Sequence, residues 1–334
     1  MSDLATLIHA SAHHLPMIDD KSVQCVVTSP PYFGLRKYDG VQDVEWGEVT
    51  YSPMAGLAPL TVPAMTCPLG NEPTIEAFIG HLILCAREWR RVLKDDGVMW
   101  VNLGDSYIGS AASGGKGHKN DGGIPYRVES VQAKKGLPAK NLMMIPARFA
   151  LAMQADGWIL RSEIIWHKPN PMPESVTGRP TKAHEQIYLL AKSERYFYDV
   201  DAVREPNKVG EAQERIPNRT LPQEGNPYRR GMVAASNGSN LGLNPLGRNL
   251  RSVWTIATQP FSGAHFAAFP EKLVEPMIKA GSRVGDTVLD PFNGSGTTGR
   301  VAIKLGRKYI GVDLAETYLD ELSPQRLTVQ MELA

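Results

Sequence analysis

The chain has 334 residues, of which 42% are hydrophobic and 21% charged, an ordinary globular composition that excludes a chain disordered throughout. Its 36 Lys and Arg against 35 Asp and Glu give a formal net charge of +1, so a nucleic-acid partner must be argued from local patches, not from a global basic field. The three cysteines are widely spaced and form no Cys-x-x-Cys pair, which predicts a protein without disulfides or bound metal. The sequence has no apolar run of about 18 residues and no secretory signal pattern, so we expect a cytoplasmic protein without a membrane span.

In chain order, short apolar runs rich in β-branched residues predict buried strands, and stretches with apolar residues every three or four positions predict helices. The expected elements are a strand at 23–27, a helix at 75–94 capped by Thr74 and stopped by Gly97, a strand at 98–101, a helix from Pro146 to Met153 ended by Gly157, strands at 159–166 and 187–190, a helix at 271–280, a strand at 287–289, a helix from near Thr297, and a strand at 309–312. This alternation predicts an α/β fold with a mostly parallel sheet and helices on both faces.

Three regions interrupt this alternation. Residues 34–73 are rich in Gly, Pro and Thr, residues 106–140 hold six Lys and Arg against two acids, and residues 201–260 hold eight against five. The last region also carries many Asn, Gly and Pro, which favours a loop-rich insertion that becomes ordered on a partner over a merely solvated excursion. We therefore expect a division into residues 1–200, an insertion at 201–260, and residues 261–334, within two domains or one large domain.

A glycine loop follows the strand expected at 287–289. Gly294, Gly296 and Gly299 match G-x-G-x-x-G between a strand and a helix, and the next strand ends at Asp313, which could bind a ribose diol. A nucleoside cofactor is therefore expected. Only 21 residues follow Asp313, too few for the α/β unit that a dinucleotide needs, and the loop begins with an acid, Asp290. A carboxylate there suits a cationic amino-acid tail, which favours S-adenosylmethionine over a nicotinamide dinucleotide.

A stiff turn follows the strand at 23–27, where the chain reads Thr-Ser-Pro-Pro-Tyr. Pro30 and Pro31 fix two successive φ angles and remove two amide donors, at the strand end where open α/β sheets bind ligands. The turn would present the Ser29 hydroxyl and the Pro30 carbonyl as acceptors beside the Tyr32 ring. Such an arrangement suits a flat substrate with an amino group, although an ordinary proline turn with a packed tyrosine is the alternative.

Together these motifs resemble those of the bacterial and phage DNA amino-methyltransferases of the β arrangement, in which a Ser-Pro-Pro-Tyr type motif precedes an Asp-Pro-Phe-x-Gly-Ser-Gly-Thr-Thr motif. The two occur here in that order at 29–32 and 290–298, and the resemblance extends over 34–36, 102–106, 164–174, 179–185 and 265–267. The resemblance implies a Rossmann-like S-adenosylmethionine-dependent methyltransferase fold. It also implies a bacterial enzyme, either part of a restriction-modification system or an orphan methylase, with a phage or mobile-element origin as an alternative.

The resemblance also implies roles for individual residues. The catalytic residues would be Ser29, Pro30, Pro31 and Tyr32. The cofactor-binding residues would be Asp290, Phe292, Asn293, Gly294, Ser295, Gly296, Thr297 and Thr298 around the methionine part, Asp313 at the ribose, and His265 and Phe266 over the carboxylate. One departure is that relatives carry an acid near the adenine ring where this chain has Ser11, so that contact would be neutral.

The implied reaction is transfer of a methyl group to adenine N6 or cytosine N4 of a base flipped out of duplex DNA, and the sequence leaves the two bases open. Cytosine C5 chemistry is not expected, because the chain has no Pro-Cys pair. The predicted DNA contacts are Arg36, Lys37, Lys116, Lys119, Arg219, Arg229, Arg230, Arg248 and Arg251. A homodimer, an amino-methyltransferase acting on RNA or protein, a nicotinamide oxidoreductase, and a binding protein without turnover remain as further hypotheses.

Overall fold

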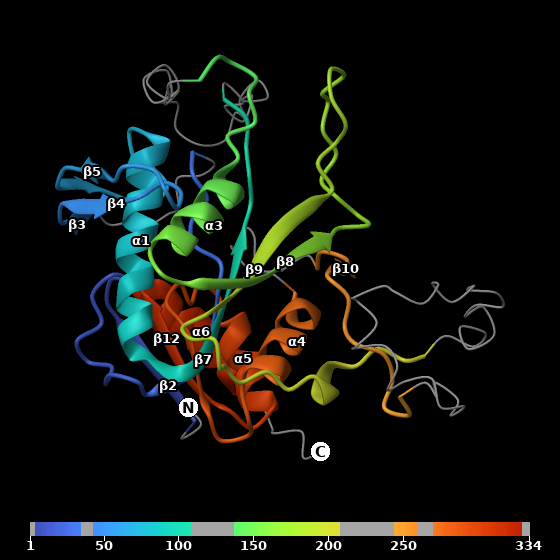
Figure 1. Ribbon diagram of the computed structural model, residues 1–334. Coiled ribbons are helices and arrows are strands. Elements are labelled where there is room, and N and C mark those ends of the chain that lie inside the picture. Colours follow the sequence, from blue (N-terminus) through green and yellow to red (C-terminus); the bar gives the residue numbers. More distant parts are fainter. Residues whose placement is uncertain (1–3, 35–42, 109–136, 208–243, 260–269, 329–334) are drawn as a thin grey trace, which may run out of the picture. The chain divides into compact units, whose positions relative to one another are not determined.

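The computed structural model describes residues 4–34, 43–108, 137–207, 244–259 and 270–328. These residues fall into two units, one made of residues 1–198 and 252–334 and the other of residues 199–251. The first unit contains a sheet of eight strands in the order β1-β12-β11-β2-β7-β9-β8-β10 (Figure 1). The strands are β1 (Ala5–His9), β2 (Val23–Thr28), β7 (Leu93–Leu103), β8 (Ile159–His167), β9 (His184–Ala191), β10 (Val253–Thr255), β11 (Thr287–Asp290) and β12 (Lys308–Asp313).

The mostly parallel sheet that the sequence predicts is confirmed. Only β9 runs antiparallel to its neighbours, β7 and β8, and the other pairs in this sheet are parallel. All six residues of β2 are buried, as expected for a central strand that is covered on both faces. The carboxyl ends of β2, β7, β11 and β12 therefore meet at one edge of the sheet.

Helices cover both faces of this sheet. In Figure 1, α1 (Ile75–Val92) and α3 (Ile145–Ala155) lie on one side, and α4 (Glu271–Gly281) and α5 (Thr297–Lys304) on the other, with the short α6 (Ser323–Leu327) next to α5. The predicted cap of α1 is confirmed, because the Thr74 side chain accepts a hydrogen bond from the Ala77 amide at 3.1 Å. The interior between α1, α3 and the sheet is filled by large apolar side chains, including Phe78, Trp89 and Phe149, all fully buried.

Several expectations about local structure were wrong. Gly97 does not stop the helix, which ends at Val92, and lies instead inside β7, where a Cβ would come within 2.6 Å of the Leu93 side chain. The edge strand β1 was not expected, because its short, half-polar sequence carries little apolar pattern. The region 34–73 is not irregular where it is described: β3 (Val44–Trp46) pairs with β6 (Met65–Cys67), and β4 (Val49–Tyr51) pairs with β5 (Leu60–Val62).

The second unit corresponds in part to the predicted insertion at 201–260. It spans residues 199–251, and its described part contains a 3-10 turn at Asp201–Val203 and a bridge between Glu205 and Arg248. Strand β10, at 253–255, falls inside the predicted insertion but belongs to the main sheet, since it pairs with β8. Its three residues are too short a run to be recognised as a strand from sequence.

Candidate active site

The two motif loops leave neighbouring strands at the same edge of the sheet. Strands β2 and β11 pair in parallel with Cys25 opposite Val288, so the Ser-Pro-Pro-Tyr turn and the glycine loop both begin at this edge. A buried hydrogen bond joins them, in which the Thr28 hydroxyl donates to Asp290 Oδ1 at 2.8 Å across 262 residues of sequence. The Thr298 hydroxyl donates to Asp290 Oδ2 at 2.7 Å. Asp290 thus fixes the glycine loop against the proline turn.

The glycine loop has a shape that requires its glycines. Gly296 precedes α5 with a φ of 76°, a left-handed conformation that side chains rarely adopt, whereas a Cβ on Gly299 would lie 2.4 Å from the Tyr309 ring. The backbone amide of Gly294 donates to Asp313 Oδ2 at 2.7 Å, which ties the loop to the end of β12. Asp313 therefore lies beside the glycine loop, and two backbone amides, of Gly294 and Ala315, already bind its carboxylate.

The two carboxylates at these strand ends are both difficult to ionise. Burial raises the pKa of Asp290 to about 7, and the nearby charge of Asp313 adds to the shift against the hydrogen bonds from Thr298 and Thr28. Burial also raises the pKa of Asp313. A cationic ligand placed beside them would stabilise both carboxylates in their charged form. The chemistry of this site therefore fits a ligand that carries positive charge.

The proline turn is held by a polar cluster that the sequence did not reveal. The Tyr32 hydroxyl donates to Glu185 Oε2 at 2.7 Å, and Asn102 Nδ2 donates to the Tyr32 oxygen at 2.8 Å and to Glu185 Oε2 at 2.9 Å. The Ser29 hydroxyl lies 3.4 Å from both the Tyr32 hydroxyl and Asn102 Nδ2. The turn after β2 and the strands β7 and β9 therefore each contribute to one hydrogen-bonded group around Ser29 and Tyr32.

Glu185 is the charged centre of this cluster. Burial acts to raise its pKa, but the Lys168 charge and the hydrogen bonds from Lys168, Tyr32 and Asn102 outweigh burial and hold the pKa below its usual value. Lys168 forms an ion pair with Glu185, and its ammonium lies 4.2 Å from the centre of the Trp166 ring. Trp166 and Lys168 of the segment at 164–174, which resembles the family, therefore support Glu185.

Gly104 makes room for the Tyr32 ring. A Cβ at this position would lie 2.4 Å from Tyr32 Cε2 and 2.7 Å from Cδ2, distances at which one of the two groups must move. Gly104 directly follows β7, and its segment was matched to the family without a role. Thr28, Asn102, Gly104, Lys168 and Glu185 are the site residues that sequence reasoning missed. The signal for the last four was their position within segments that resemble the family.

Other predicted residues are only partly described. Ser11 follows β1 next to Asp313, since the Ala10 amide donates to the Asp313 carbonyl at 3.2 Å, and its hydroxyl lies 2.6 Å from His13 Nδ1. In the second unit, Arg248 and Arg251 both form ion pairs with Glu205 at 2.9 Å. The predicted residues that lie outside the described part of the chain are Arg36, Lys37, Lys116, Lys119, Arg219, Arg229, Arg230, His265 and Phe266.

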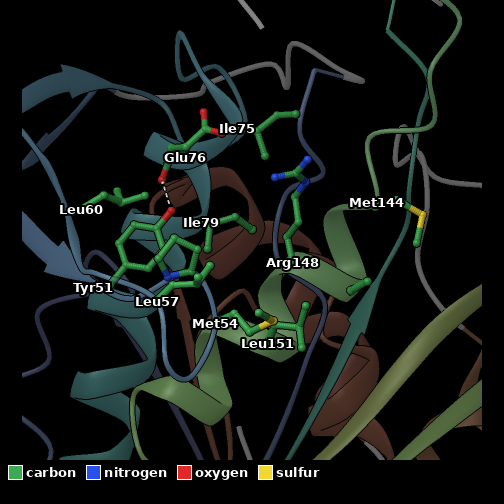
Figure 2. A pocket seen from close by; sticks show the side chains of 12 residues that line it. Tyr51, Met54, Leu57, Leu60, Ile75, Glu76, Ile79, Met144, Arg148 and Leu151 are labelled. Carbon is green, nitrogen blue, oxygen red and sulfur yellow. Dashed lines mark hydrogen bonds between the residues drawn. The ribbon is translucent and has the colours of Figure 1, made fainter. Parts of the chain in front are cut away.

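A surface pocket elsewhere in the first unit contains none of these residues (Figure 2). It has a volume of about 430 Å³ and a mainly apolar lining from the β4–β5 hairpin, α1 and α3, with Met54, Leu57 and Leu151 among its residues. The Tyr51 hydroxyl at its wall donates to the Glu76 carbonyl at 2.9 Å, as Figure 2 shows. Glu76 and Arg148 are the charged residues of this lining, and neither belongs to the motifs at the strand ends. Among the described residues, no helix has the length and apolar character needed to cross a membrane.

Comparison with known proteins agrees with this geometry. The sequence model of the N6/N4 DNA methylases matches residues 23–323. The chain belongs to this family. The Type II methyltransferase M.Cfr9I of Citrobacter freundii is 39% identical over 320 residues, which cover 95% of this chain and 85% of that protein. This N6/N4 DNA methylase is therefore an enzyme that methylates amino groups in DNA, and the nicotinamide, RNA and protein alternatives are not supported.

Solved structures share the fold. PvuII DNA methyltransferase, described as cytosine-N4-specific, matches with a TM-score of 0.60 at 17% identity, covering 100% of this chain and 89% of that one. A candidate DNA modification methylase from Thermus thermophilus, complexed with S-adenosyl-L-methionine, matches with a TM-score of 0.52 at 22% identity, covering 97% of this chain and 93% of that one. At these identities the likeness establishes a Rossmann-like methyltransferase fold.

Proposed function

We propose that this DNA methylase transfers a methyl group from S-adenosylmethionine to the exocyclic amine of a flipped base, cytosine N4 or adenine N6. The observation that carries the proposal is the Thr28–Asp290 hydrogen bond, which holds the catalytic turn and the glycine loop side by side. A methyl group can be transferred only between groups in contact, so the two loops must adjoin. Membership of the N6/N4 DNA methylase family and the raised pKa values of Asp290 and Asp313 support the same proposal.

The cofactor would be held by the glycine loop and the two strand-end acids. Bound there, it supplies an electrophilic methyl group on a positively charged sulfur. Asp290 and Asp313 would stabilise the positive charge and the ribose, and Gly294 and Gly296 allow a ligand to approach the loop backbone. Phe292, Asn293, Ser295, Thr297 and Thr298 remain proposed cofactor residues. Of these, Thr298 acts through Asp290, and Asn293 is held by Tyr309 and Ser323.

The turn would position the target amine. The Ser29 hydroxyl and the Pro30 carbonyl accept its hydrogens while the Tyr32 ring stacks on the base, so the amine lone pair points at the methyl carbon. In this arrangement the amine nitrogen would bond to the methyl carbon as the bond from that carbon to the cofactor's sulfur breaks, which would leave a neutral thioether, and the excess proton on the methylated amine would pass to solvent. Glu185 and Asn102 hold the Tyr32 hydroxyl and so keep the ring in one orientation throughout. No covalent enzyme intermediate is required.

DNA recognition remains a separate proposal. Arg248 and Arg251 would contact phosphates or guanine edges by exchanging their ion pairs with Glu205 for contacts with DNA. The predicted arginines and lysines outside the described residues stay in the proposal with them. A homodimer, which would double the positive surface, is also proposed; sedimentation of a monomer both with and without DNA would contradict it.

Transfer of labelled methyl groups to duplex DNA, followed by nucleoside mass spectrometry, tests the function and identifies the base. N4-methylcytosine or N6-methyladenine is the expected product, and sequencing of modified bases would give the recognised site. Ser29→Ala and Tyr32→Ala should abolish transfer and leave cofactor binding near normal. Full activity in both variants would contradict the catalytic assignment.

A further inference from the structure

Behind the catalytic turn, the chain buries a carboxylate and an imidazole that the proposed reaction does not use. Glu72 and His81 are both 0% exposed, and Glu72 Oε1 lies 2.9 Å from His81 Nδ1. The Trp46 ring stacks on the imidazole at 4.2 Å with an angle of 7° between the planes. Removing such a pair from water is costly, and apolar residues of similar volume are often equally stable there. Stability alone therefore does not explain the pair.

A chain of backbone contacts connects this pair to the catalytic turn. Glu72 Oε2 accepts a hydrogen bond from the Gly70 amide at 2.8 Å, and the Gly70 carbonyl accepts one from the Gly34 amide at 2.8 Å. Gly34 lies two residues after Tyr32. A Cβ on Gly70, whose φ is 94°, would be 3.0 Å from the Tyr32 carbonyl oxygen. The segment at 68–72 is thus packed directly on the backbone of the catalytic turn.

We propose that His81 and Glu72 are positioning residues for methyl transfer. Together they fix the conformation at Gly70, and Gly70 fixes the backbone from Tyr32 to Gly34. This backbone decides where the Tyr32 ring stands relative to the target amine. An error of about 1 Å in such a position can lower a rate about 100-fold.

Helix α1 supports the turn at a second point. The Phe33 ring, which is 2% exposed and directly follows Tyr32, stacks on Phe78 of α1 with 5.1 Å between centres and 28° between planes. His81 lies one turn further along the same helix. Helix α1 therefore supports the end of the catalytic turn in two ways. Phe78 packs on Phe33, and His81 acts through the hydrogen bonds of Glu72 and Gly70. The Glu185 cluster holds the Tyr32 side chain from another direction, through its hydroxyl.

The same residues could instead bind a metal ion, because one potential ligand atom each from Cys67, Glu72 and His81 lies within 4.8 Å of the others. One observation favours positioning: both Glu72 oxygens already accept hydrogen bonds, from the Gly70 amide and from His81. The experiment below separates the two readings.

The test compares kcat, cofactor KM and melting temperature in variants of the full-length chain. His81→Phe keeps an aromatic ring for Trp46 but removes the hydrogen bond, and Gly70→Ala adds a methyl group against the Tyr32 carbonyl. Both should lower kcat about tenfold or more with cofactor KM changed less than about twofold, because the glycine loop is bonded to Thr28 and Asp313 and not to the segment at 68–72. Glu72→Gln keeps an acceptor for the Gly70 amide and should have an intermediate kcat. Leu82→Ala, a buried neighbour on α1, is the control for lost stability alone.

Several outcomes would overturn the proposal. The proposal fails if kcat per folded molecule in His81→Phe and Gly70→Ala stays within about twofold of the wild-type value. It also fails if the loss of kcat in these variants only follows the fall in melting temperature, as it would in Leu82→Ala. If a chelator lowers wild-type activity to the level of His81→Phe, and Zn²⁺ restores it, the cluster binds metal and the proposal fails. The inference rests on the catalytic role of the turn. If Ser29→Ala retains activity, that role fails; if Ser29→Ala is inactive while His81→Phe is normal, only the present inference fails.

Discussion

The hydrogen bond between Tyr32 and Glu185 is expected to contribute directly to the rate. Tyr32→Phe removes the hydroxyl and leaves Glu185 with Asn102 and Lys168 as partners. Glu185→Gln keeps the size of the side chain but removes the charge to which the hydroxyl donates. Because Tyr32 holds the base in the proposed mechanism, either change loosens the ring at the moment of transfer.

The magnitude follows from the nature of this contact. It is a 2.7 Å hydrogen bond to a partly buried carboxylate, whose side chain is 15% exposed, and hydrogen bonds to charged groups contribute about 1.5–3 kcal/mol. Since about 1.4 kcal/mol changes a rate tenfold, each single substitution should lower kcat by about 10- to 100-fold. The double variant should be little worse than the more impaired single variant, because both substitutions remove the same interaction.

The assay is steady-state methylation of DNA with melting temperatures measured in parallel, since Glu185→Gln also leaves Lys168 without its ion pair. Tyr51→Phe is a matched control: it removes a tyrosine hydroxyl that donates at 2.9 Å to the Glu76 carbonyl, away from the site, and should leave kcat unchanged. The reasoning is refuted if the two losses in kcat multiply in the double variant, or if Tyr32→Phe is as active as Tyr51→Phe.

Three further outcomes are expected. Gly104→Ala, whose methyl would lie 2.4 Å from the Tyr32 ring, should lower kcat more than about tenfold, and unchanged kinetics would show that the ring is not held there. Because burial raises the pKa of Asp290 to about 7, against about 3.9 in an unfolded chain, its contribution to stability is present below about pH 4 and is lost as pH rises through about 7. A cationic cofactor favours the ionised form, so its affinity should rise with pH up to about 7, and calorimetry that gives a pH-independent Kd would contradict this. Cys25 and Cys85 are buried with raised thiol pKa values, so mass spectrometry should find both unalkylated in the active protein at neutral pH.

Most strands of the sheet and most helices that cover it could be predicted, because the spacing of apolar residues that defines them can be recognised within a short stretch of sequence. The strand at 23–27, the Thr74 cap and the helix start near Thr297 are all found within a residue of their expected places. The prediction for Gly97 was wrong because a glycine near a helix end can serve more than one structural purpose. Here the glycine is needed for close packing against Leu93 within β7, not to end the helix. Strands β3 to β6 escaped because three-residue strands are defined by their partners and not by a repeating pattern.

For the site, the sequence by itself determined the chemistry of two loops: a rigid turn with acceptors and an aromatic ring, and a glycine loop between two acids. Both are contiguous motifs, so their residue types and spacing can be recognised without a fold. Only the tertiary structure decided that Glu185, 153 residues from Tyr32 in sequence, accepts a hydrogen bond from the Tyr32 hydroxyl, and that Gly104 leaves room for the Tyr32 ring. The physical reason is the sheet, which brings the carboxyl ends of β2, β7 and β11 and the amino end of β9 together regardless of their separation along the chain.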